Sequence, residues 1–451
     1  MSFNKDFIWG SATSSYQIEG APFEDGKGLS VWDTFCEVPG VIKGNHNGNI
    51  ACEHYHRYKE DVALMKELGL QAYRFSITWP RVMPDGIGKV NEKGLDFYDR
   101  LVDELLEKGI TPYVTLFHWD YPYELYKKGG WLNNDSPEWF AEYTKVVVDR
   151  LSDRVQYWFT QNEPQCYINL GHCDGTHAPG LKLGVRDVLQ CTHNSLLAHG
   201  KSVATIREFS KLKSFVGAAP VGICYIPKTE TPADIEAARK ATFAVNDTRI
   251  WNSAWFMDPM FLGEYPEDGL KLFEKYLPKI GANDMKIINQ DLDFFGCNIY
   301  SSPYVNSGLN GEPEFTAQKV GADLTANKWE LTPRGLYWGP KFFYERYKKP
   351  IIITENGLSN VDWVNLDGKV HDPQRIDLMH RYINEFNRAI KDGVDGRGYF
   401  AWSLMDNFEW AEGYNERFGL IHVDFETEKR TIKDSGYWFK QVIETQGKIL
   451  E

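Results

Sequence analysis

The sequence predicts an α/β protein built on a single (β/α)8 barrel, the TIM barrel architecture, with long loops at the carboxyl ends of its strands. Short runs rich in β-branched and aromatic residues recur eight times along the chain, and helical patterns follow them. This alternation is typical of a parallel sheet. Eight strand–helix units in one chain close into a barrel with its helices outside.

The predicted strands are distributed over the whole chain. They span Phe7–Gly10, Ala72–Trp79, Thr111–Trp119, Val155–Thr160, Phe215–Tyr225, Phe294–Tyr300, Ile351–Glu355 and Tyr399–Leu404. Three predicted helices show apolar residues at helical spacing with a glycine just beyond their ends: Tyr58–Leu68, Gly94–Lys108 and Gln374–Lys391.

We expect one catalytic domain over residues 1–451. No linker rich in Gly, Ser or Pro and no low-complexity tract interrupts the strand–helix pattern. The connections after the first, fifth and sixth strands are long and irregular, for example Gly26–Ala51 and Ser301–Leu331. Long ordered loops in a compact enzyme usually serve its active site.

Charge and composition narrow the classes of partner. With 50 Lys and Arg against 63 Asp and Glu, the formal net charge is -13. Such a chain repels phosphate backbones and anionic lipid surfaces, so we expect neither nucleic acid nor membrane as a partner. Aromatic residues make up 14% of the chain. Most belong to a core, but flat rings with polar edges also suit ring-shaped ligands such as sugars.

Cysteine usage and the chain start predict a cytoplasmic protein. The seven cysteines are scattered without a C-x-x-C pair, which fits reduced thiols. The first residues lack a basic start followed by an apolar stretch, and no run of 18 apolar residues occurs. Cys52, His54 and His56 carry metal-capable side chains, but no fourth ligand is evident. We expect no metal and no cofactor.

Chemically useful residues follow the ends of the predicted strands, where the active site of such a barrel gathers. These residues are Arg74, His118, Trp119, Asn162, Glu163, Asn298, Tyr300, Glu355, Trp402, Glu409 and Trp410. Taken singly, each could be an ordinary turn residue or a solvated side chain without a function. Together they place Glu163 and Glu355 across the barrel mouth with imidazole, indole and amide groups between them.

Two facing carboxyl groups are the layout of a glycosidase. One carboxylic acid protonates the leaving oxygen, and one carboxylate meets the oxocarbenium-like carbon. A separation of about 5–5.5 Å gives retention of configuration, and roughly 6.5–9.5 Å leaves room for water and gives inversion. Sequence alone does not measure that distance.

Motifs over essentially the whole chain resemble glycoside hydrolase family 1. They are, in order, FIWGSATSSYQIEG, YRFSITWPR, LFHWD, TQNEP, HAPG, NIY, ITENG and WSLMDNFEWAEGY, with RFGL behind. The resemblance implies a (β/α)8 barrel and a retaining β-glycosidase of the β-glucosidase type. It implies Glu163 of NEP as acid/base and Glu355 of TENG as nucleophile.

The resemblance also implies roles for the surrounding residues. Arg74, Tyr300 and Asn298 would support the nucleophile, and Trp402 would form a platform beneath the sugar ring. The expected hydroxyl contacts and sugar-binding residues are Gln17, His118, Trp119, Asn162, Glu409 and Trp410, with Trp329 on the leaving-group side. The expected substrate is a small-molecule β-glycoside or short oligosaccharide.

The chemistry of the pair explains how one residue serves twice. The negative charge of Glu355 would raise the pKa of Glu163 and keep it protonated. Once Glu355 is esterified by the sugar that charge disappears, so Glu163 loses its proton readily and can activate water.

Three positions depart from the pattern of many family β-glucosidases. Gln165 stands directly after NEP where Trp is common, Gln161 precedes Asn162, and Tyr121 replaces a common Leu. We expect the changes at Gln165 and Tyr121 to alter the wall beyond the cleaved bond, and with it the leaving-group preference.

Alternative functions remain open from sequence. A 6-phospho-β-glycosidase would carry Ser, Lys and Tyr after the eighth strand, whereas this chain has Glu409, Glu416 and Phe418, which would repel a phosphate. A silent glycan-binding protein or a myrosinase-like enzyme is disfavoured because both glutamates are present. Transglycosylation, the choice among gluco, galacto and fuco substrates, the natural leaving group and the oligomeric state stay undecided.

Overall fold

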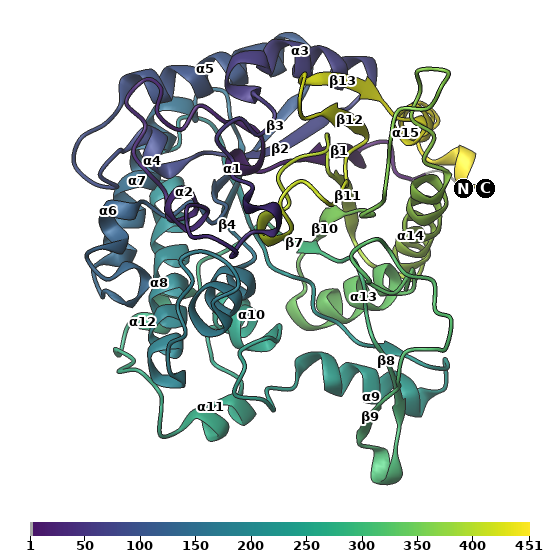
Figure 1. Ribbon diagram of the computed structural model, residues 1–451. Coiled ribbons are helices and arrows are strands. Elements are labelled where there is room, and N and C mark those ends of the chain that lie inside the picture. The colour runs from purple at the N-terminus through teal and green to yellow at the C-terminus, as the bar shows by residue number, and fades with distance from the viewer. Residues whose placement is uncertain (1–2) are drawn as a thin grey trace.

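Eight parallel strands form a closed barrel in the computed structural model, which describes residues 3–451 (Figure 1). Their order around the barrel is β1-β11-β10-β7-β5-β4-β3-β2. The strands are β1 Ile8–Ala12, β2 Ala72–Ser76, β3 Thr111–Phe117, β4 Tyr157–Asn162, β5 Phe215–Ala219, β7 Phe294–Asn298, β10 Ile351–Asn356 and β11 Gly396–Trp402. The predicted (β/α)8 barrel is confirmed.

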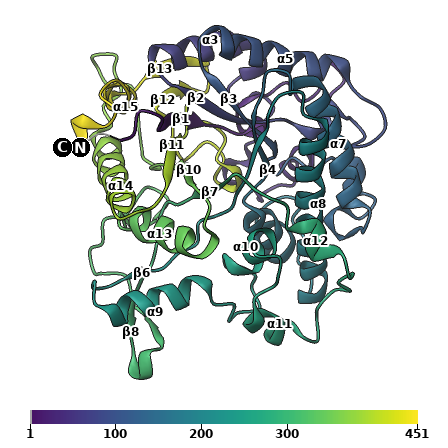
Figure 2. The same cartoon turned by 180° about the vertical axis from the view of Figure 1, so that it is seen from behind.

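Helices surround the barrel, and Figure 2 shows α7 and α8 on one flank with α13 and α14 on the other. The main helices are α3 His54–Glu67, α5 Glu92–Glu107, α7 Ser136–Leu151, α8 Val185–Phe209, α13 Gly335–Tyr347, α14 Pro373–Lys391 and α15 Asp434–Glu444. Between β5 and β7 lie α9 Pro232–Phe243, α10 Ala254–Phe261, α11 Glu267–Phe273 and α12 Asp284–Ile288. The three helices expected from sequence coincide with α3, α5 and α14 to within a few residues.

Shorter elements decorate the loops. The short helices are α1 Ser15–Ile18, α2 Val31–Phe35, α4 Trp79–Val82 and α6 Tyr123–Tyr126, with 3-10 turns at Lys43–Asn45, Gly130–Leu132, Leu309–Gly311, Trp410–Glu412 and Lys448–Leu450. A π-helical segment spans Cys166–Asp174. Strands β6 Ile226–Pro227, β8 Tyr304–Ser307 and β9 Pro313–Phe315 form one small sheet, and β12 Ile421–Asp424 pairs with β13 Lys429–Ile432.

Several predicted strand ends are wrong. β2 ends at Ser76, and Trp79 begins α4 because Pro80 suits the first turn of a helix and cannot donate to a strand ladder. β5 ends at Ala219, since Pro220 follows it. β3 ends at Phe117, because Trp119 adopts a positive φ of 79°.

The remaining ends shift by small amounts. β1 runs two residues further than expected, β4 begins and ends two residues later, and β10 includes one further residue. β7 stops two residues before Tyr300, and β11 begins at Gly396 and ends at Trp402.

The core has two layers separated by the barrel wall. The inside of the barrel is filled by a compact cluster that includes Tyr113, Phe159, Phe294, Ile352 and Phe400. A much larger cluster fills the space between the strands and the helices. Gly10 of β1 leaves room for Phe400, whose ring would lie 2.5 Å from a Cβ added there.

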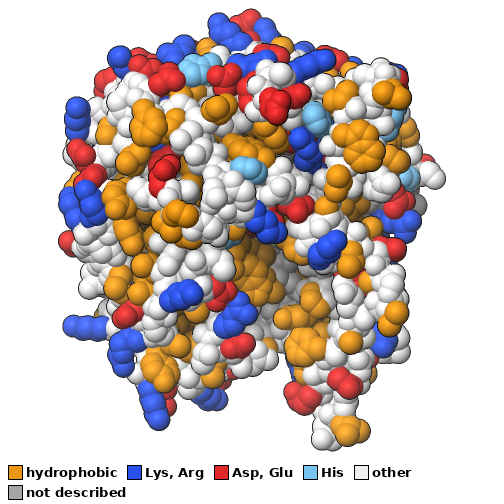
Figure 3. All heavy atoms as spheres, in the orientation of Figure 1, with side chains coloured by type: hydrophobic (Ala, Val, Ile, Leu, Met, Phe, Trp, Pro, Cys, Tyr) orange, Lys and Arg blue, Asp and Glu red, His pale blue; other side chains and the backbone are white. Residues whose placement is uncertain are grey.

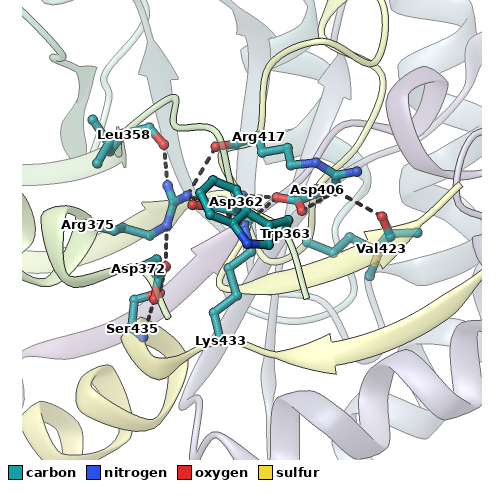
Figure 4. Close-up of polar contacts among 12 residues, drawn as sticks. Leu358, Asp362, Trp363, Asp372, Arg375, Asp406, Arg417, Val423, Lys433 and Ser435 are labelled. Carbon is teal, nitrogen blue, oxygen red and sulfur yellow. Dashed lines mark hydrogen bonds and ion pairs between the residues drawn. The ribbon is translucent and has the colours of Figure 1, made fainter. Parts of the chain in front are cut away.

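A buried network of charged side chains ties the loop after β11 to β13 and to the start of α14 (Figure 4). Lys433 Nζ donates to Asp362 Oδ2 at 2.6 Å and to Asp406 Oδ1 at 2.7 Å. Arg375 contacts Asp362 and donates to Asp372, and Arg417 donates to Asp406. Because Asp406 follows Trp402 and precedes Glu409, this network holds the loop that carries both residues.

The face seen in Figure 1 is hollowed below its centre, with hydrophobic side chains on the walls of the hollow (Figure 3). The two ends of the described chain lie side by side (Figure 1). Among residues 3–451, no helix is both long and apolar enough to cross a membrane.

Candidate active site

A cavity of about 550 Å³ lies at the carboxyl ends of the barrel strands. Its walls bring together ten of the residues expected from sequence: His118, Trp119, Glu163, Asn298, Tyr300, Trp329, Glu355, Trp402, Glu409 and Trp410. Arg74, Asn162 and Gln17 do not line the cavity. Arg74 and Asn162 lie behind its walls and contact residues that line it, whereas Gln17 contacts Phe408, next to the lining residue Glu409.

Glu355 ends up beside a fixed cation. It lies near the end of β10, and the residue is 4% exposed. Arg74 Nη1, from β2, donates to Glu355 Oε1 at 2.6 Å, and the Tyr300 hydroxyl donates to Oε2 at 2.8 Å. Burial raises the pKa of Glu355, while the Arg74 guanidinium and the Tyr300 hydrogen bond act against that rise.

Glu163 has only neutral partners. It follows β4 with a positive φ of 44°, a conformation that non-glycine residues rarely adopt and that is enriched at functional sites. Asn298 Nδ2 donates to its Oε1 at 2.8 Å, and Cys166 Sγ lies 3.1 Å from its Oε2. Burial and the neighbouring Glu355 raise the pKa of Glu163 to about 7.

Three side chains from alternate strands link the two carboxyl groups. Asn162 Oδ1 accepts from Arg74 Nη2 at 2.6 Å and from Asn298 Nδ2 at 3.1 Å. Asn298 also donates to Glu163 and lowers the pKa of Glu355 through a side-chain hydrogen bond. Its Oδ1 accepts from the Thr354 hydroxyl at 2.6 Å, which fixes the direction of the amide. One amide group therefore lies against both glutamates.

The two carboxyl groups therefore differ in their surroundings. A guanidinium at 2.6 Å favours the ionised form of Glu355. Glu163 has no cation within ion-pair distance among the described residues, and its negative neighbour favours the protonated form. Of the two groups, Glu163 holds a proton more tightly, and Glu355 carries the negative charge more readily.

Aromatic rings form one wall of the cavity. The His118 ring is nearly parallel to Trp402 and Trp410, with centroids 5.8 Å and 5.9 Å away. Trp119 packs against Trp410 at 4.4 Å and donates its indole N–H to the Asn162 carbonyl. Flat indole faces of this kind cover the C–H surface of a sugar ring.

His118 presents one nitrogen that has no protein partner. Asn162 Nδ2 contacts His118 Nε2 at 3.0 Å, and His118 Nδ1 is buried without a hydrogen-bond partner in the described part of the chain. Burial lowers the pKa of His118 well below its usual value, so the ring is neutral. A neutral imidazole with a free N–H is suited to a sugar hydroxyl.

Gln17 already has protein partners at both ends of its amide. Its Nε2 donates to Asn407 Oδ1 and to the Phe408 carbonyl, and its Oε1 accepts from Ser14. The structure therefore places Gln17 as a support for the chain just before Glu409. Glu409 itself lines the cavity, where burial and neighbouring carboxylates raise its pKa to about 8.

The two departures expected to shape the leaving-group wall do not line the cavity. The Gln165 amide bonds to Val221 through both its nitrogen and its oxygen, and Tyr121 is buried against Trp79 and Trp131. The expectation that these two side chains form that wall is therefore wrong, and their effect on the leaving-group preference stays a prediction. Gln165 bends back toward Val221, which lines the wall in its place. Gln161 is buried and hydrogen-bonds Tyr167 and Ser195.

Sequence reasoning missed a set of cavity residues contributed by irregular segments. They are Cys166, Leu170, His177, Val221, Ile223, Cys224, Tyr225, Trp251, Asn327 and Glu412. His177 belongs to the HAPG motif, and Cys166 follows NEP by two residues. Their position in or beside these motifs could have identified them as cavity residues. Leu170, Val221, Ile223 and Trp251 make the outer part of the cavity largely apolar.

The three metal-capable side chains noted in the sequence point to separate partners. Cys52 donates to the Asp406 carbonyl, His54 contacts Asp61, and His56 contacts Glu24. Within residues 3–451, no three His, Cys, Asp or Glu side chains are arranged to hold a metal ion.

Paired carboxyl groups in a cavity walled by indole rings, at the carboxyl end of a (β/α)8 barrel, define a glycosidase. The profile of glycosyl hydrolase family 1 matches residues 1–448. The chain belongs to this family, as its motifs predict.

Individual relatives resemble the chain over nearly its whole length. A 1,4-beta-D-glucan glucohydrolase of Thermotoga neapolitana is 46% identical over 446 residues, covering 99% of each chain. Beta-glucosidase A of Acetivibrio thermocellus is also 46% identical, over 453 residues and 99% of each chain. The structure of a beta-glucosidase from Thermotoga maritima in complex with glucoimidazole superimposes with a TM-score of 0.91 at 44% identity, covering 99% of both chains.

Proposed function

We propose that this protein is a retaining β-glucosidase that releases non-reducing terminal β-D-glycosyl residues, with Glu355 as nucleophile and Glu163 as acid/base. The observation that carries the proposal is the unequal environment of the two carboxyl groups. Arg74 keeps Glu355 ionised, and Glu163 has only neutral partners. Retention requires a separation of about 5–5.5 Å, and the Asn298 amide, which acts on both groups, supports their close approach.

The first step forms a glycosyl-enzyme ester. A Glu355 carboxylate oxygen attacks the anomeric carbon as the glycosidic C–O bond breaks, and the leaving oxygen takes the proton of Glu163. Because the ester removes the charge on Glu355, the main electrostatic cause of the raised pKa of Glu163 disappears. Glu163 then holds its negative charge more readily.

The second step returns both residues to their starting forms. Glu163 takes a proton from water, the water oxygen attacks the anomeric carbon, and the ester bond to Glu355 breaks. Two inversions at one carbon give overall retention. A sugar or an alcohol in the outer cavity can take the place of water, which would give transglycosylation.

Neutral sugars fit the inner cavity better than sugar phosphates. Glu409 lines the cavity, and Glu416 interacts electrostatically with it. Burial and neighbouring carboxylates already raise the pKa of Glu409, so this part of the cavity disfavours negative charge and would disfavour a phosphate dianion. Phe418 also lines the cavity and offers no hydrogen-bond donor. The names of the relatives, a β-glucan glucohydrolase and β-glucosidases, support a glucoside substrate.

The outer cavity favours leaving groups with apolar faces. Trp329 is 40% exposed and Trp251 38% exposed at the cavity, and Leu170 and Ile223 lie on its wall. Indole and aliphatic surfaces gain most from flat or apolar leaving groups, although a glucose ring also has a C–H face that an indole can cover. Aryl glucosides and short β-glucans are therefore both candidate substrates.

The deciding experiment compares wild type with Glu355→Ala and Glu163→Ala on a dinitrophenyl β-D-glucoside and its 6-phosphate. Glu355→Ala should lose activity by at least about a thousandfold. Glu163→Ala should keep the first step on this substrate, whose leaving group needs no proton, and should regain turnover when azide is added as an external nucleophile. Glu444→Gln, an exposed carboxyl change on α15, is the matched control.

Several outcomes would contradict the proposal. Proton NMR of the first product should show the β-anomer, and an α-anomer would mean inversion. Turnover of the 6-phosphate alone would overturn the assignment of a neutral sugar. Full activity of Glu355→Ala would remove the proposed nucleophile.

We further propose that the chain acts as one catalytic domain in the cytoplasm, on small-molecule glycosides and without nucleic acid. All seven cysteines are unpaired in the described structure, and all but Cys173 are buried, which suits a reducing compartment. Fractionation of cells, with detection of the protein in the soluble cytoplasmic fraction, tests the location.

A further inference from the structure

The two oxygens of Glu163 have partners of very different strength. Oε1 accepts a hydrogen bond from the Asn298 amide at 2.8 Å, and Thr354 fixes that amide in turn. Oε2 faces only the Cys166 sulfur, at 3.1 Å, among the described hydrogen-bonding groups. A thiol is both a weak donor and a weak acceptor. Oε2 is therefore the oxygen that a substrate can engage at little cost.

The backbone fixes the Cys166 thiol in this place. The Cys166 N–H donates to the Glu163 carbonyl at 2.9 Å and closes a turn over Pro164 and Gln165. Two hydrogen bonds between the Gln165 side-chain amide and the Val221 backbone anchor the same turn to the chain after β5. Cys166 also begins the π-helical segment Cys166–Asp174, and its side chain lines the cavity while being only 7% exposed.

We propose that Cys166 is a positioning residue for the acid/base: its thiol keeps Glu163 Oε2 turned toward the leaving group and donates to that oxygen once it has lost its proton. The proposal rests on the proposed role of Glu163. In the first step, sulfur is too poor an acceptor to hold the Oε2 proton, so the proton stays available to the leaving oxygen. In the second step, the S–H stabilises the carboxylate that activates water. The thiol proton stays on sulfur throughout.

Other charged and titratable groups act on Glu163 from several elements. Glu355 on β10 favours its protonated form, and Glu163 also interacts electrostatically with Glu409 after β11 and with Tyr300 after β7. Arg74 on β2 favours its ionised form. None of these groups is altered by changing Cys166, so a change in the titration of Glu163 in Cys166 variants reports the thiol itself.

The test is the pH dependence of kcat/KM for an aryl β-D-glucoside whose leaving group needs protonation. The basic limb of this profile reports the loss of the Glu163 proton in the free enzyme. Cys166→Ala removes a donor to the carboxylate and should move the limb up by about half a pH unit, whereas Cys166→Ser supplies a stronger donor of similar size and should move it down by about as much.

The matched control is Cys224→Ala. Cys224 is a second thiol on the cavity wall, but its sulfur faces the Ser302 hydroxyl at 3.1 Å rather than a carboxyl group. The basic limb of the pH profile of Cys224→Ala should therefore coincide with that of the wild type. Thermal unfolding of all three variants checks that they are folded, and the serine variant preserves the size of the side chain.

The outcomes separate this inference from the function on which it rests. If the alanine and serine variants leave the limb in place, or move it in the same direction, Cys166 only packs against Glu163 and the proposal is wrong. If Glu163→Gln retains the wild-type basic limb, the assignment of Glu163 as acid/base has failed instead. Opposite shifts for alanine and serine, with no shift for Cys224→Ala, establish the thiol as a partner of the acid/base.

Discussion

Replacing Lys433 by Met tests the buried network that holds the loop after β11. The Lys433 side chain is fully buried and donates to Asp362 and Asp406 (Figure 4). Removing one partner of a buried ion pair costs about 3–5 kcal/mol, because it leaves a charge without its counterion. Arg375 still contacts Asp362, and Arg417 still contacts Asp406. Each carboxylate therefore keeps one cation, and we expect a cost near the lower value.

This cost converts to a measurable shift in Tm. The entropy of unfolding is about 2.1 cal/mol/K per residue, so for a chain of 451 residues each kcal/mol shifts Tm by roughly 1 °C. Lys433→Met should lower Tm by about 3 °C, measured by calorimetry at a fixed scan rate. Arg381→Met breaks an ion pair with Asp377 whose side chains are 62% and 54% exposed, and should lower Tm by less than about 1 °C.

The same change should reach the active site through Asp406. Asp406 accepts from Lys433, from Arg417 and from the Gly419 N–H, within the segment that joins Trp402 to β12. We expect kcat/KM for a glucoside to fall by roughly tenfold, which corresponds to about 1.4 kcal/mol of lost transition-state binding. Equal Tm shifts and equal activities for Lys433→Met and Arg381→Met would refute the reasoning.

Three further predictions concern the carboxyl pair and the outer cavity. Tyr300→Phe removes the 2.8 Å hydrogen bond to Glu355, which favours the ionised form of that carboxyl group. The acidic limb of the pH profile of kcat/KM should therefore move to higher pH, and kcat should fall roughly ten- to a hundredfold. An acidic limb that does not move would contradict this prediction. Because the raised pKa of Glu163, about 7, lets the folded state hold its proton more tightly than the unfolded state, stability falls as pH rises from about 4.5 to about 7. Glu163→Gln should therefore exceed wild type in Tm by about 2–3 °C at pH 8 and by little at pH 4.5, and a constant difference in calorimetry would count against it. Leu170→Ser should lower kcat/KM for an octyl glucoside several-fold more than for cellobiose. The reason is that only the alkyl chain loses apolar contact, at about 25 cal/mol per Å². Equal losses for the two substrates in steady-state assays would exclude the apolar wall as a determinant of leaving-group preference.

The barrel and the meeting of Glu163 and Glu355 in one cavity were predictable because both follow from local patterns. A strand–helix alternation repeated eight times has few other closed solutions, and the chemistry of such a barrel gathers where its strands end. Glu163 and Glu355 stand at two of those ends. Strand ends were less predictable, because prolines and positive φ angles end strands without changing their hydrophobic pattern.

Contacts between distant segments were not predictable. Gln165 follows NEP directly, yet its side chain bonds to Val221, more than fifty residues away. Its position in the sequence therefore did not show that its side chain points away from the leaving-group wall. The thiol beside Glu163 depends on a turn that begins at a residue with positive φ. Lys433 meets Asp362 across 71 positions of the chain. Hydrophobic periodicity carries no information about such pairings.

The asymmetry of the carboxyl pair follows from how a barrel fills its interior. Side chains of alternate strands share a layer inside an eight-stranded barrel. Arg74, Asn162, Asn298 and Trp402 come from β2, β4, β7 and β11, which are the second, fourth, sixth and eighth barrel strands. The first three form a continuous hydrogen-bonded chain across the barrel. Glu355 belongs to the seventh strand, and Arg74 reaches it from this layer, whereas Glu163 receives from the same layer only the amide of Asn298. The barrel therefore delivers a cation to one glutamate and a neutral donor to the other, which is the difference that acid/base and nucleophile require.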